Sequence, residues 1–190
     1  MTLKGVLWLC VFFCLPQVRS SPSRCTFKQR LIEISLQHLD ELGEPFSKHC
    51  IRDNVLIPFP KDAYTTAVDS QGEIQLVVYE TLKSINSLFE KEDTPSTWNQ
   101  RQLDDFQNIV FRQHHEFKRC MKRNKGRKRL SNSSSGDRTA LVKIYFKKMQ
   151  RVLEEKNYSS CAWEVIRKEL RQVLLIILDQ FSDGLLNTSR

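Results

Sequence analysis

Apolar residues recur with the period of an α-helix in five separate segments, and this limits the fold more than any other feature of the sequence. Within each segment they return every three or four positions, which places them on one face of a helix. No segment shows the alternation that a half-buried strand requires. We therefore predict an all-α fold, a bundle of five helices. The five stripes are Phe27, Leu31, Ile34, Leu39 and Leu42; Ile74, Val78, Leu82, Ile85, Leu88 and Phe89; Leu103, Phe106, Val110 and Phe117; Leu141, Tyr145, Met149 and Val152; and Trp163, Ile166, Leu170, Val173, Leu174, Ile177 and Phe181.

The connections between the segments differ in length, and the first one sets the topology. Residues 44–69 hold three of the six prolines and show no sustained period, so they are predicted to form a long crossover loop. Such a crossover lets the first two helices run parallel, as in up-up-down-down cytokine bundles. Capping-box patterns at Ser70–Glu73 and at Thr97 with Gln100 predict two helix starts, and Asp137 predicts another.

The first 20 residues have the layout of a secretory signal peptide. Lys4 precedes an uncharged run from Gly5 to Leu15, and the small residues Val18 and Ser20 fit a signal-peptidase site. The run of about 11 residues is too short for a membrane-spanning helix, which needs roughly 20. We expect secretion, cleavage after Ser20 and one mature domain at 21–190. Cleavage removes two basic residues and no acid, so the formal net charge falls from +8 to +6. Solubility alone explains such a charge.

Four of the six cysteines remain in the predicted mature chain. An even number in a secreted protein points to two disulfides, and the spacing leaves all three pairings open. The absence of a C-x-x-C pattern argues against a zinc or redox site. The four cysteines are Cys25, Cys50, Cys120 and Cys161.

No group of residues has the spacing of a catalytic site. His114, His115 and Glu116 are adjacent, so on a helix their side chains point in different directions. There is no nucleophile elbow and no glycine-rich phosphate loop. The sequence therefore predicts a protein that is not an enzyme and that needs no cofactor or resident metal ion.

Residues 121–137 are predicted to form a flexible basic loop. The run Lys122–Arg129 could bind heparan sulfate weakly, or another polyanion such as anionic lipid or nucleic acid, through charge alone. The other interpretation, which we prefer, is that the run is a solvated linker. It lacks interleaved aromatic residues, so nucleic-acid binding is not expected, and neither is membrane insertion.

Three glycosylation sequons begin at Asn132, Asn157 and Asn187. All three fall in a predicted loop, turn or tail, where a glycan can be accommodated.

Two local patterns resemble one known family. The last helix begins Cys161-Ala-Trp-Glu-Val-Ile-Arg, which is similar to the Cys-Ala-Trp-Glu-Val-Val-Arg opening of the last helix in type I interferons. The crossover loop carries Cys50-Ile-Arg-Asp followed by Phe59-Pro60, which resembles the first loop of that family. The order of helices and the four cysteines extend the resemblance over the mature chain. The likeness is greatest to the four-cysteine fish interferons.

The resemblance implies a disulfide pairing and a receptor surface. It pairs Cys25 with Cys120 and Cys50 with Cys161, so that the crossover loop is held against the last helix. That surface would bind one chain of a heterodimeric class II cytokine receptor, and outward faces of the second, third and fourth helices would bind the other. The implied contact residues are Ile51, Arg52, Asn54, Arg167, Lys168 and Arg171.

Some of these residues depart from the family pattern. Lys168 and Arg171 stand where the family often has smaller or apolar residues, and Asn54 stands where the mammalian loop has a basic contact. Arg167 is expected to point partly outward, so that Arg167→Ala would weaken receptor binding and leave the melting temperature unchanged.

The implied function is a secreted cytokine that induces antiviral gene expression. The alternatives are another helical cytokine, a basic antimicrobial or glycan-binding protein acting through residues 122–129, and a secreted hydrolase.

Overall fold

Five long helices and two short ones make up the part of the chain that the structure describes. The computed structural model describes residues 25–43, 46, 48–65, 71–90, 94–124, 133–183 and 186, and these ranges contain no strand. The all-α prediction is confirmed. The long helices are α2 (Gln29–Asp40), α4 (Gln71–Leu88), α5 (Gln100–Asn124), α6 (Ser133–Glu155) and α7 (Ser160–Ser182), and the short ones are η1 (Lys48–Asp53) and α3 (Lys61–Tyr64).

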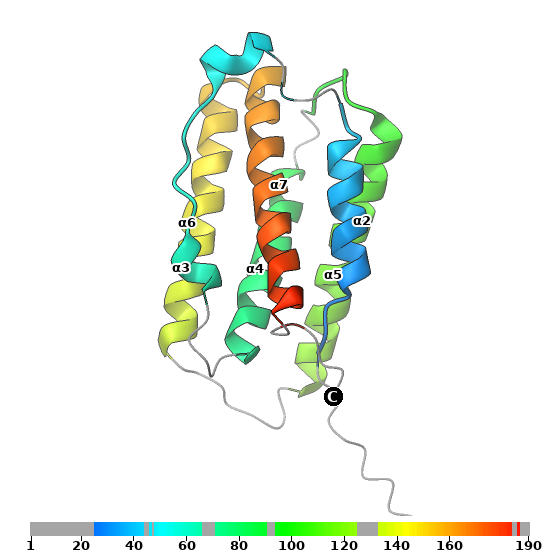
Figure 1. Cartoon of the computed structure of the whole chain (residues 1–190), viewed down its shortest axis with the longest axis vertical. Coiled ribbons are helices and arrows are strands. Elements are labelled where there is room, and N and C mark those ends of the chain that lie inside the picture. Colours follow the sequence, from blue (N-terminus) through cyan, green and yellow to red (C-terminus); the bar gives the residue numbers. More distant parts are fainter. Residues whose placement is uncertain are drawn as a thin grey trace, which may run out of the picture.

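The long helices form a ring in which each packs against two neighbours. The order round the ring is α2, α5, α4, α6, α7 and back to α2. In Figure 1, α2 and α4 run upward while α5 and α7 run downward, and α6 runs upward beside α4. The first two long helices are therefore parallel, which gives the predicted up-up-down-down arrangement with α6 as the additional helix. In this ring α7 lies across from the edge where α4 meets α5.

The crossover between α2 and α4 is more ordered than its sequence suggests. It carries η1 at the upper end of the bundle, then descends beside α6 to α3 (Figure 1). The ring of Phe59 stacks on Tyr64 and meets the edge of Tyr145 on α6, with 5.4 Å between centroids in both pairs. The Tyr64 hydroxyl shares a 2.7 Å hydrogen bond with Thr81 of α4. These aromatic contacts fix the second half of the crossover to the bundle.

Two helix starts differ from the predicted caps. The side chain of Asn99 accepts a 3.3 Å hydrogen bond from the backbone N–H of Gln102, so Asn99, not Thr97, caps α5. Asp137 lies inside α6, which begins at Ser133. The expectation of a loop over 121–137 is corrected at both ends, because α5 continues to Asn124 and α6 starts at Ser133; residues 125–132 lie outside the described residues. The last helix is capped by Ser159, whose hydroxyl accepts from the N–H of Ala162.

The core confirms most of the predicted stripes and shifts two of them. All the predicted inward residues of α5 and α7 are buried. On α2, Ile32 and Ser35 are fully buried while Leu31 and Ile34 are only partly so. On α6, Val142 is fully buried and Leu141 is 39% exposed.

The predicted signal peptide lies outside the described residues. Within the described part of the chain, no helix combines the length and apolar character needed to span a bilayer.

Candidate functional site

The two disulfides tie helix ends together at opposite ends of the bundle. Cys25 is bonded to Cys120 near the end of α5, and Cys50 of η1 is bonded to Cys161 at the start of α7. This is the pairing that the family resemblance implies. In Figure 1, η1 and the start of α7 are at the upper end, whereas the end of α5 is at the lower end. The upper disulfide joins the crossover loop, which carries three of the six predicted contact residues, to α7, which carries the other three.

Large aliphatic side chains are exposed on the loop segment that this disulfide holds. Ile51 is 61% exposed and Leu56 is 89% exposed. Neighbouring side chains of the same loop, Cys50 and Ile57, are buried. The alternation presents two apolar side chains to solvent from an anchored backbone, which is typical of a protein–protein contact rather than of a mobile loop.

Polar contacts from α7 and from the turn after α6 hold the same loop. The Lys168 ammonium donates to Oδ1 of Asn54 at 2.8 Å, and the Lys156 ammonium lies 2.9 Å from Oδ1 of Asp53. The predicted residues Ile51, Asn54 and Lys168 are therefore brought together. We call this region the η1–α7 surface, and its members are Ile51, Arg52, Asn54, Leu56, Lys168 and Arg171.

Arg171 lies one turn further along α7 and contacts α2. Its Nε donates to Oδ1 of Asp40 at 2.9 Å, with both side chains about half exposed. Arg52 is exposed on η1. The η1–α7 surface thus combines two apolar side chains with three exposed or half-exposed cationic ones.

The prediction that Arg167 points outward is wrong. Arg167 is only 9% exposed, and its Nε and Nη2 donate to Oε2 of Glu164 at 3.0 and 2.6 Å. Its Nη1 donates to the carbonyl oxygen of Gly43 at 3.5 Å. The helical wheel places Arg167 at the edge of the buried face, and the turn that follows α2 covers that edge. Arg167 joins α7 to this turn rather than presenting its charge to a partner.

Glu164 connects the same site to the start of α5. The indole Nε1 of Trp98 donates to Oε1 of Glu164 at 2.8 Å. A Cβ at Gly43 would lie 3.4 Å from Cδ1 of Trp98, so the turn approaches the indole closely. The carboxylate of Glu164 is therefore the common acceptor for Trp98, from the segment before α5, and Arg167 of α7.

Next to Lys168, Glu169 is a buried carboxylate with two donors. The Tyr145 hydroxyl donates to Oε2 of Glu169 at 2.6 Å, and the Lys168 ammonium lies 3.1 Å from Oε1. Burial raises the pKa of Tyr145 well above its usual value, and the hydrogen bond to Glu169 adds to the shift. Lys168 therefore bridges the exposed loop and the buried interior.

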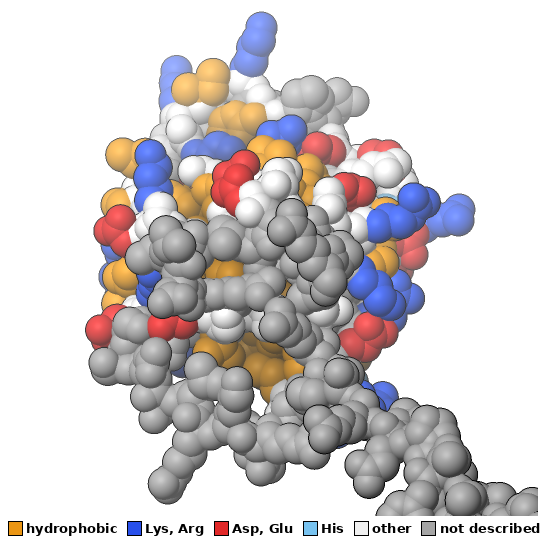
Figure 2. Space-filling view, turned by 60° about the horizontal axis from the view of Figure 1, so that its bottom comes forward, with side chains coloured by type: hydrophobic (Ala, Val, Ile, Leu, Met, Phe, Trp, Pro, Cys, Tyr) orange, Lys and Arg blue, Asp and Glu red, His pale blue; other side chains and the backbone are white. Residues whose placement is uncertain are grey.

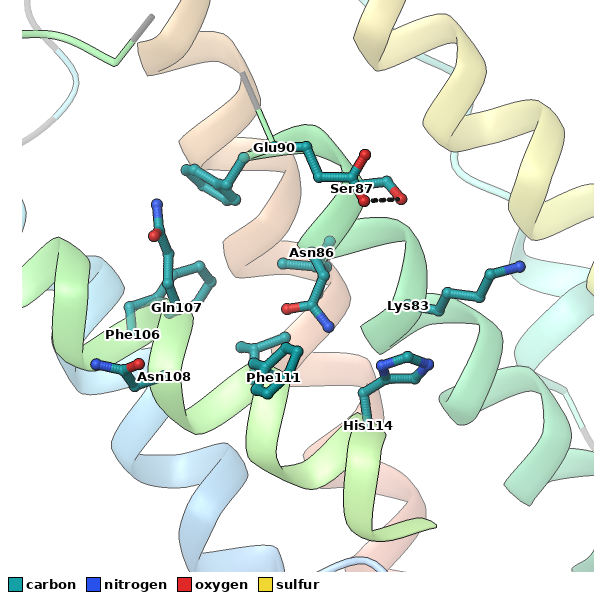
Figure 3. A pocket seen from close by; sticks show the side chains of 12 residues that line it. Lys83, Asn86, Ser87, Glu90, Phe106, Gln107, Asn108, Phe111 and His114 are labelled. Carbon is teal, nitrogen blue, oxygen red and sulfur yellow. Dashed lines mark hydrogen bonds between the residues drawn. The ribbon is translucent and has the colours of Figure 1, made fainter. Parts of the chain in front are cut away.

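A second candidate surface is a groove between α4 and α5. It has a volume of about 460 Å³ and lies on the ring edge across from α7. Figure 3 shows Phe111 in this groove, and its side chain is 57% exposed and stacks on His115 with 5.7 Å between ring centroids. A hydrogen bond of 3.3 Å joins Ser87 to Glu90 at the α4 side. We call this the α4–α5 groove; its lining residues in Figure 3 include Lys83, Asn86, Asn108, Phe111 and His114.

Two polar atoms in the α4–α5 groove are buried without a hydrogen-bond partner among the described residues. They are Nδ2 of Asn86 and Nε2 of His114. Burial lowers the pKa of His114, and the nearby cations Lys118 and Lys83 lower it further. The imidazole is therefore favoured in its neutral form. Unpaired polar groups beside an exposed aromatic ring suit a surface that a partner completes.

Two apolar members of these surfaces, Phe111 and Leu56, were not among the residues predicted from the sequence. Phe111 lies outside the α5 stripe, and Leu56 lies in a segment without periodicity. An aromatic residue on the polar face of an amphipathic helix was the available signal for Phe111. Leu56 had no comparable signal, because its exposure depends on how the crossover packs.

The residues that the structure describes offer little to a metal ion. Among the described residues, one potential ligand group places His49 beside Cys50 and Cys161, with their ligand atoms within 4.8 Å of one another. Both sulfurs belong to a disulfide, so neither is a thiolate that could bind a metal.

Of the three sequons, the structure describes only that at Asn157. Asn157 is exposed in the turn between α6 and α7 and has a φ of 49°. Asparagine tolerates this left-handed backbone better than most residues. Asn132 and Asn187 lie outside the described residues.

The fold and the comparisons together identify the class. A helical bundle with parallel first and second long helices and a long first crossover held by a disulfide defines a helical cytokine. Residues 25–183 match the Interferon family, described as the interferon alpha/beta domain. The chain belongs to the type I interferon family, whose members are secreted cytokines and not enzymes.

Fish and mammalian relatives are among the matches. Interferon a3 of Oncorhynchus mykiss is 30% identical over 173 residues, covering 88% of this chain and 90% of the relative. Interferon omega-2 of Equus caballus is 30% identical over 149 residues, covering 77% and 76%. The solved structure of zebrafish interferon 2 is 34% identical with a TM-score of 0.74, covering 81% of this chain and 99% of that one. Zebrafish interferon 1 gives 25% identity and a TM-score of 0.64, with 83% and 95% covered.

Proposed function

We propose that this interferon is secreted, binds two different class II cytokine receptor chains at once and thereby induces antiviral gene expression. Family membership supports binding to receptors of this class. The two chains, the residues that bind them and the antiviral response are the proposal. No bond is made or broken on the interferon itself, because its role is to hold the two receptor chains together.

The η1–α7 surface binds the first receptor chain. The observation that carries this is the pair of exposed aliphatic side chains, Ile51 and Leu56, on the segment anchored by the Cys50–Cys161 bridge. An anchored loop loses little conformational entropy on binding, so more of the contact energy remains as affinity. Lys168 and Arg171 supply charges at the edge of this apolar pair, where they favour the encounter and fix the orientation.

Arg167 has a different role from the one that the resemblance implies. It is a positioning residue that holds the N-terminal part of α7 against the turn after α2. Its effect on receptor binding passes through the placement of Lys168 and Arg171.

The α4–α5 groove binds the second receptor chain. It lies across the helix ring from α7, so two chains can contact the protein without meeting at one site. Phe111 is its exposed aromatic anchor. A neighbouring hollow of about 480 Å³ on the other side of α4, lined in part by Lys143 and Phe146, extends the same face toward α6.

A double variant, Ile51→Ser with Leu56→Ser, tests the first surface. Binding is measured to the ectodomain of each class II cytokine receptor chain of the same species, immobilised one at a time. We expect one chain to lose at least about tenfold in affinity, because two apolar anchors are removed. The matched control is Ile144→Ser, which removes an exposed aliphatic side chain of α6. Parental affinity of the double variant for every chain would overturn the assignment.

Secretion depends on the predicted signal peptide at 1–20. N-terminal sequencing of the protein recovered from culture medium tests it, with Ser21 expected as the first residue. Recovery of the chain from the cell pellet alone would contradict this.

A further inference from the structure

Basic side chains line the exposed face of the second half of α5. They recur at spacings of three and four residues, so they lie along one side of the helix, and all are exposed. Glu116 is the only acidic residue between positions 112 and 123, and it is 3.9 Å from Lys28 of the segment before α2. We call this the α5 basic stripe; its members are Arg112, His115, Arg119, Lys122 and Arg123.

Helix-end electrostatics account for only part of the stripe. Lys122 and Arg123 lie in the last turn of α5, where cations interact favourably with the helix dipole. Arg112 and Arg119 lie further from the end, where that effect has faded. From Arg112 to Arg123 the stripe extends about 17 Å along the helix. Its length and its excess of basic over acidic side chains fit a linear polyanion rather than one small anion.

The stripe lies at the end of the bundle that carries the Cys25–Cys120 bridge. Figure 2 brings this end forward and shows Lys and Arg side chains gathered on its right-hand side, where α2 and α5 lie in Figure 1. The η1–α7 surface is at the other end of the molecule. A polymer bound to the stripe therefore leaves Ile51 and Leu56 accessible.

We propose that the α5 basic stripe binds a sulfated glycosaminoglycan of the cell surface or matrix. Guanidinium groups match the paired oxygens of carboxylate and, by the same geometry, of sulfate. Successive sulfates along the polymer meet Arg112, Arg119 and Arg123 on one face. Binding of this kind holds the secreted protein near cells while its first receptor surface remains free.

Nucleic acid and membrane fit the stripe less well. Apart from Phe111, which stacks on His115 at one end of the stripe, no exposed aromatic Phe, Tyr or Trp side chain lies between positions 112 and 123 of α5. The apolar face of α5 is buried in the core and is not available to enter a bilayer. The inference differs from the sequence prediction for 122–129, because Lys122 and Arg123 are the only basic residues of that run in the described part of the chain.

Heparin affinity of three full-length secreted variants tests the proposal. The stripe variant is Arg119→Gln with Lys122→Gln and Arg123→Gln; glutamine keeps the helix propensity and removes three charges. The control is Lys147→Gln with Lys148→Gln and Arg151→Gln, the same change on exposed positions of α6. A third variant replaces Lys125, Arg127 and Lys128 with Gln. Affinity is measured on immobilised heparin at physiological salt, with chondroitin sulfate and single-stranded DNA as competitors.

We expect the stripe variant to bind about tenfold more weakly, because each exposed charge contact contributes a few-fold. The α6 control should stay within about twofold of the parent, and raised salt should remove the difference. Heparin should compete better than DNA. Equal losses in the stripe and α6 variants, a loss confined to the third variant, or stronger competition by DNA would each overturn the proposal.

Discussion

The guanidinium of Arg167 makes two hydrogen bonds to a single carboxylate oxygen of Glu164, at 3.0 Å from Nε and 2.6 Å from Nη2. The other oxygen of Glu164 accepts from Trp98 at 2.8 Å. Trp98, from the segment before α5, and Arg167 of α7 therefore meet at one carboxylate, and Arg167 also reaches the turn after α2. Arg167, the arginine of the Cys-Ala-Trp-Glu-Val-Ile-Arg motif, therefore stabilises the fold and is not itself an exposed contact residue.

Arg167→Ala should lower the melting temperature. Both side chains of the ion pair are almost fully buried, so the variant leaves Glu164 charged and short of donors. Breaking a buried pair in this way costs about 3 kcal/mol, which corresponds to roughly 6–12 °C in a domain of this size. The measurement is thermal unfolding followed by circular dichroism.

Lys28→Ala is the control for Arg167→Ala. Lys28 is mostly exposed and is 3.9 Å from Glu116, so its loss should leave the melting temperature nearly unchanged. An unchanged melting temperature for both variants would restore the sequence-based expectation that Arg167 is a solvated contact residue.

Trp98→Phe and Arg167→Ala should not be additive. Both remove a donor to Glu164, and phenylalanine keeps most of the ring volume of Trp98 in the core. Residues in one hydrogen-bond network show coupling energies of about 0.5–3 kcal/mol. A double-mutant cycle by urea unfolding should give a coupling of at least about 1 kcal/mol. Strict additivity would mean that Glu164 does not link the two residues.

The two disulfides should differ in function although they contribute similarly to the stability of the protein. They close loops with sequence separations of 95 and 111 residues, and each should contribute about 4–5 kcal/mol by restricting the unfolded chain. Replacing Cys50 and Cys161 by Ser should also raise amide hydrogen exchange in η1 and weaken binding of the first receptor chain. Replacing Cys25 and Cys120 by Ser should leave exchange in η1 unchanged. Equal exchange in η1 for both pairs would contradict a specific anchoring role.

Alkaline pH should destabilise the fold through Tyr64 and Tyr145. Burial raises the pKa of both hydroxyls above the ordinary value of about 10. The folded state therefore keeps protons that the unfolded state loses above about pH 10, so stability is lost as pH rises beyond that point. Each group adds about 1.4 kcal/mol per pH unit to this loss. Between pH 10 and 11, where the unfolded tyrosine is still partly protonated, Tyr145→Phe should reduce the fall in unfolding free energy by about 1 kcal/mol. If unfolding free energy falls with pH equally steeply in the parent and the variant, Tyr145 is not the source of the alkaline destabilisation.

Where helical periodicity alone decides burial, the sequence was a sufficient guide. Trp163, Ile166 and Leu170 are spaced at three and four positions on a strongly apolar helix, and all are fully buried. Neighbouring helices contact this face along its length, so small differences in helix rotation cannot expose it.

At the edges of the apolar stripes, packing against the neighbouring helix decides which side chains are buried. Leu141 and Val142 are four and three positions before Tyr145, so both are compatible with its face, and packing buries Val142. Ser35 is polar by type, but its hydroxyl donates to the carbonyl of Leu31 at 2.8 Å, which lets it be buried without a missing hydrogen bond. Arg167 belongs to the same group of residues, because the turn after α2 covers it.

Receptor crosslinking predicts that the two surfaces can be separated by mutation. Phe111 is exposed in the α4–α5 groove, so Phe111→Asp introduces a charge without disturbing the core. A desolvated charge opposite an apolar contact should lower the affinity for the second receptor chain by at least about tenfold. The first chain should bind as tightly as before, because the η1–α7 surface is on the far side of the helix ring. The variant should therefore bind the first receptor chain but fail to recruit the second, so no signal is started.

This makes Phe111→Asp a competitive antagonist. Added in excess to cells treated with the parent protein, it should reduce the induction of antiviral genes, whereas alone it should induce little. The control is Gln29→Asp, which makes the same change in charge at the first position of α2, where an acid is tolerated. It should signal like the parent and should not antagonise. Full signalling by Phe111→Asp would remove the α4–α5 groove from the receptor contact, and loss of binding to both chains would show that the two surfaces are not independent.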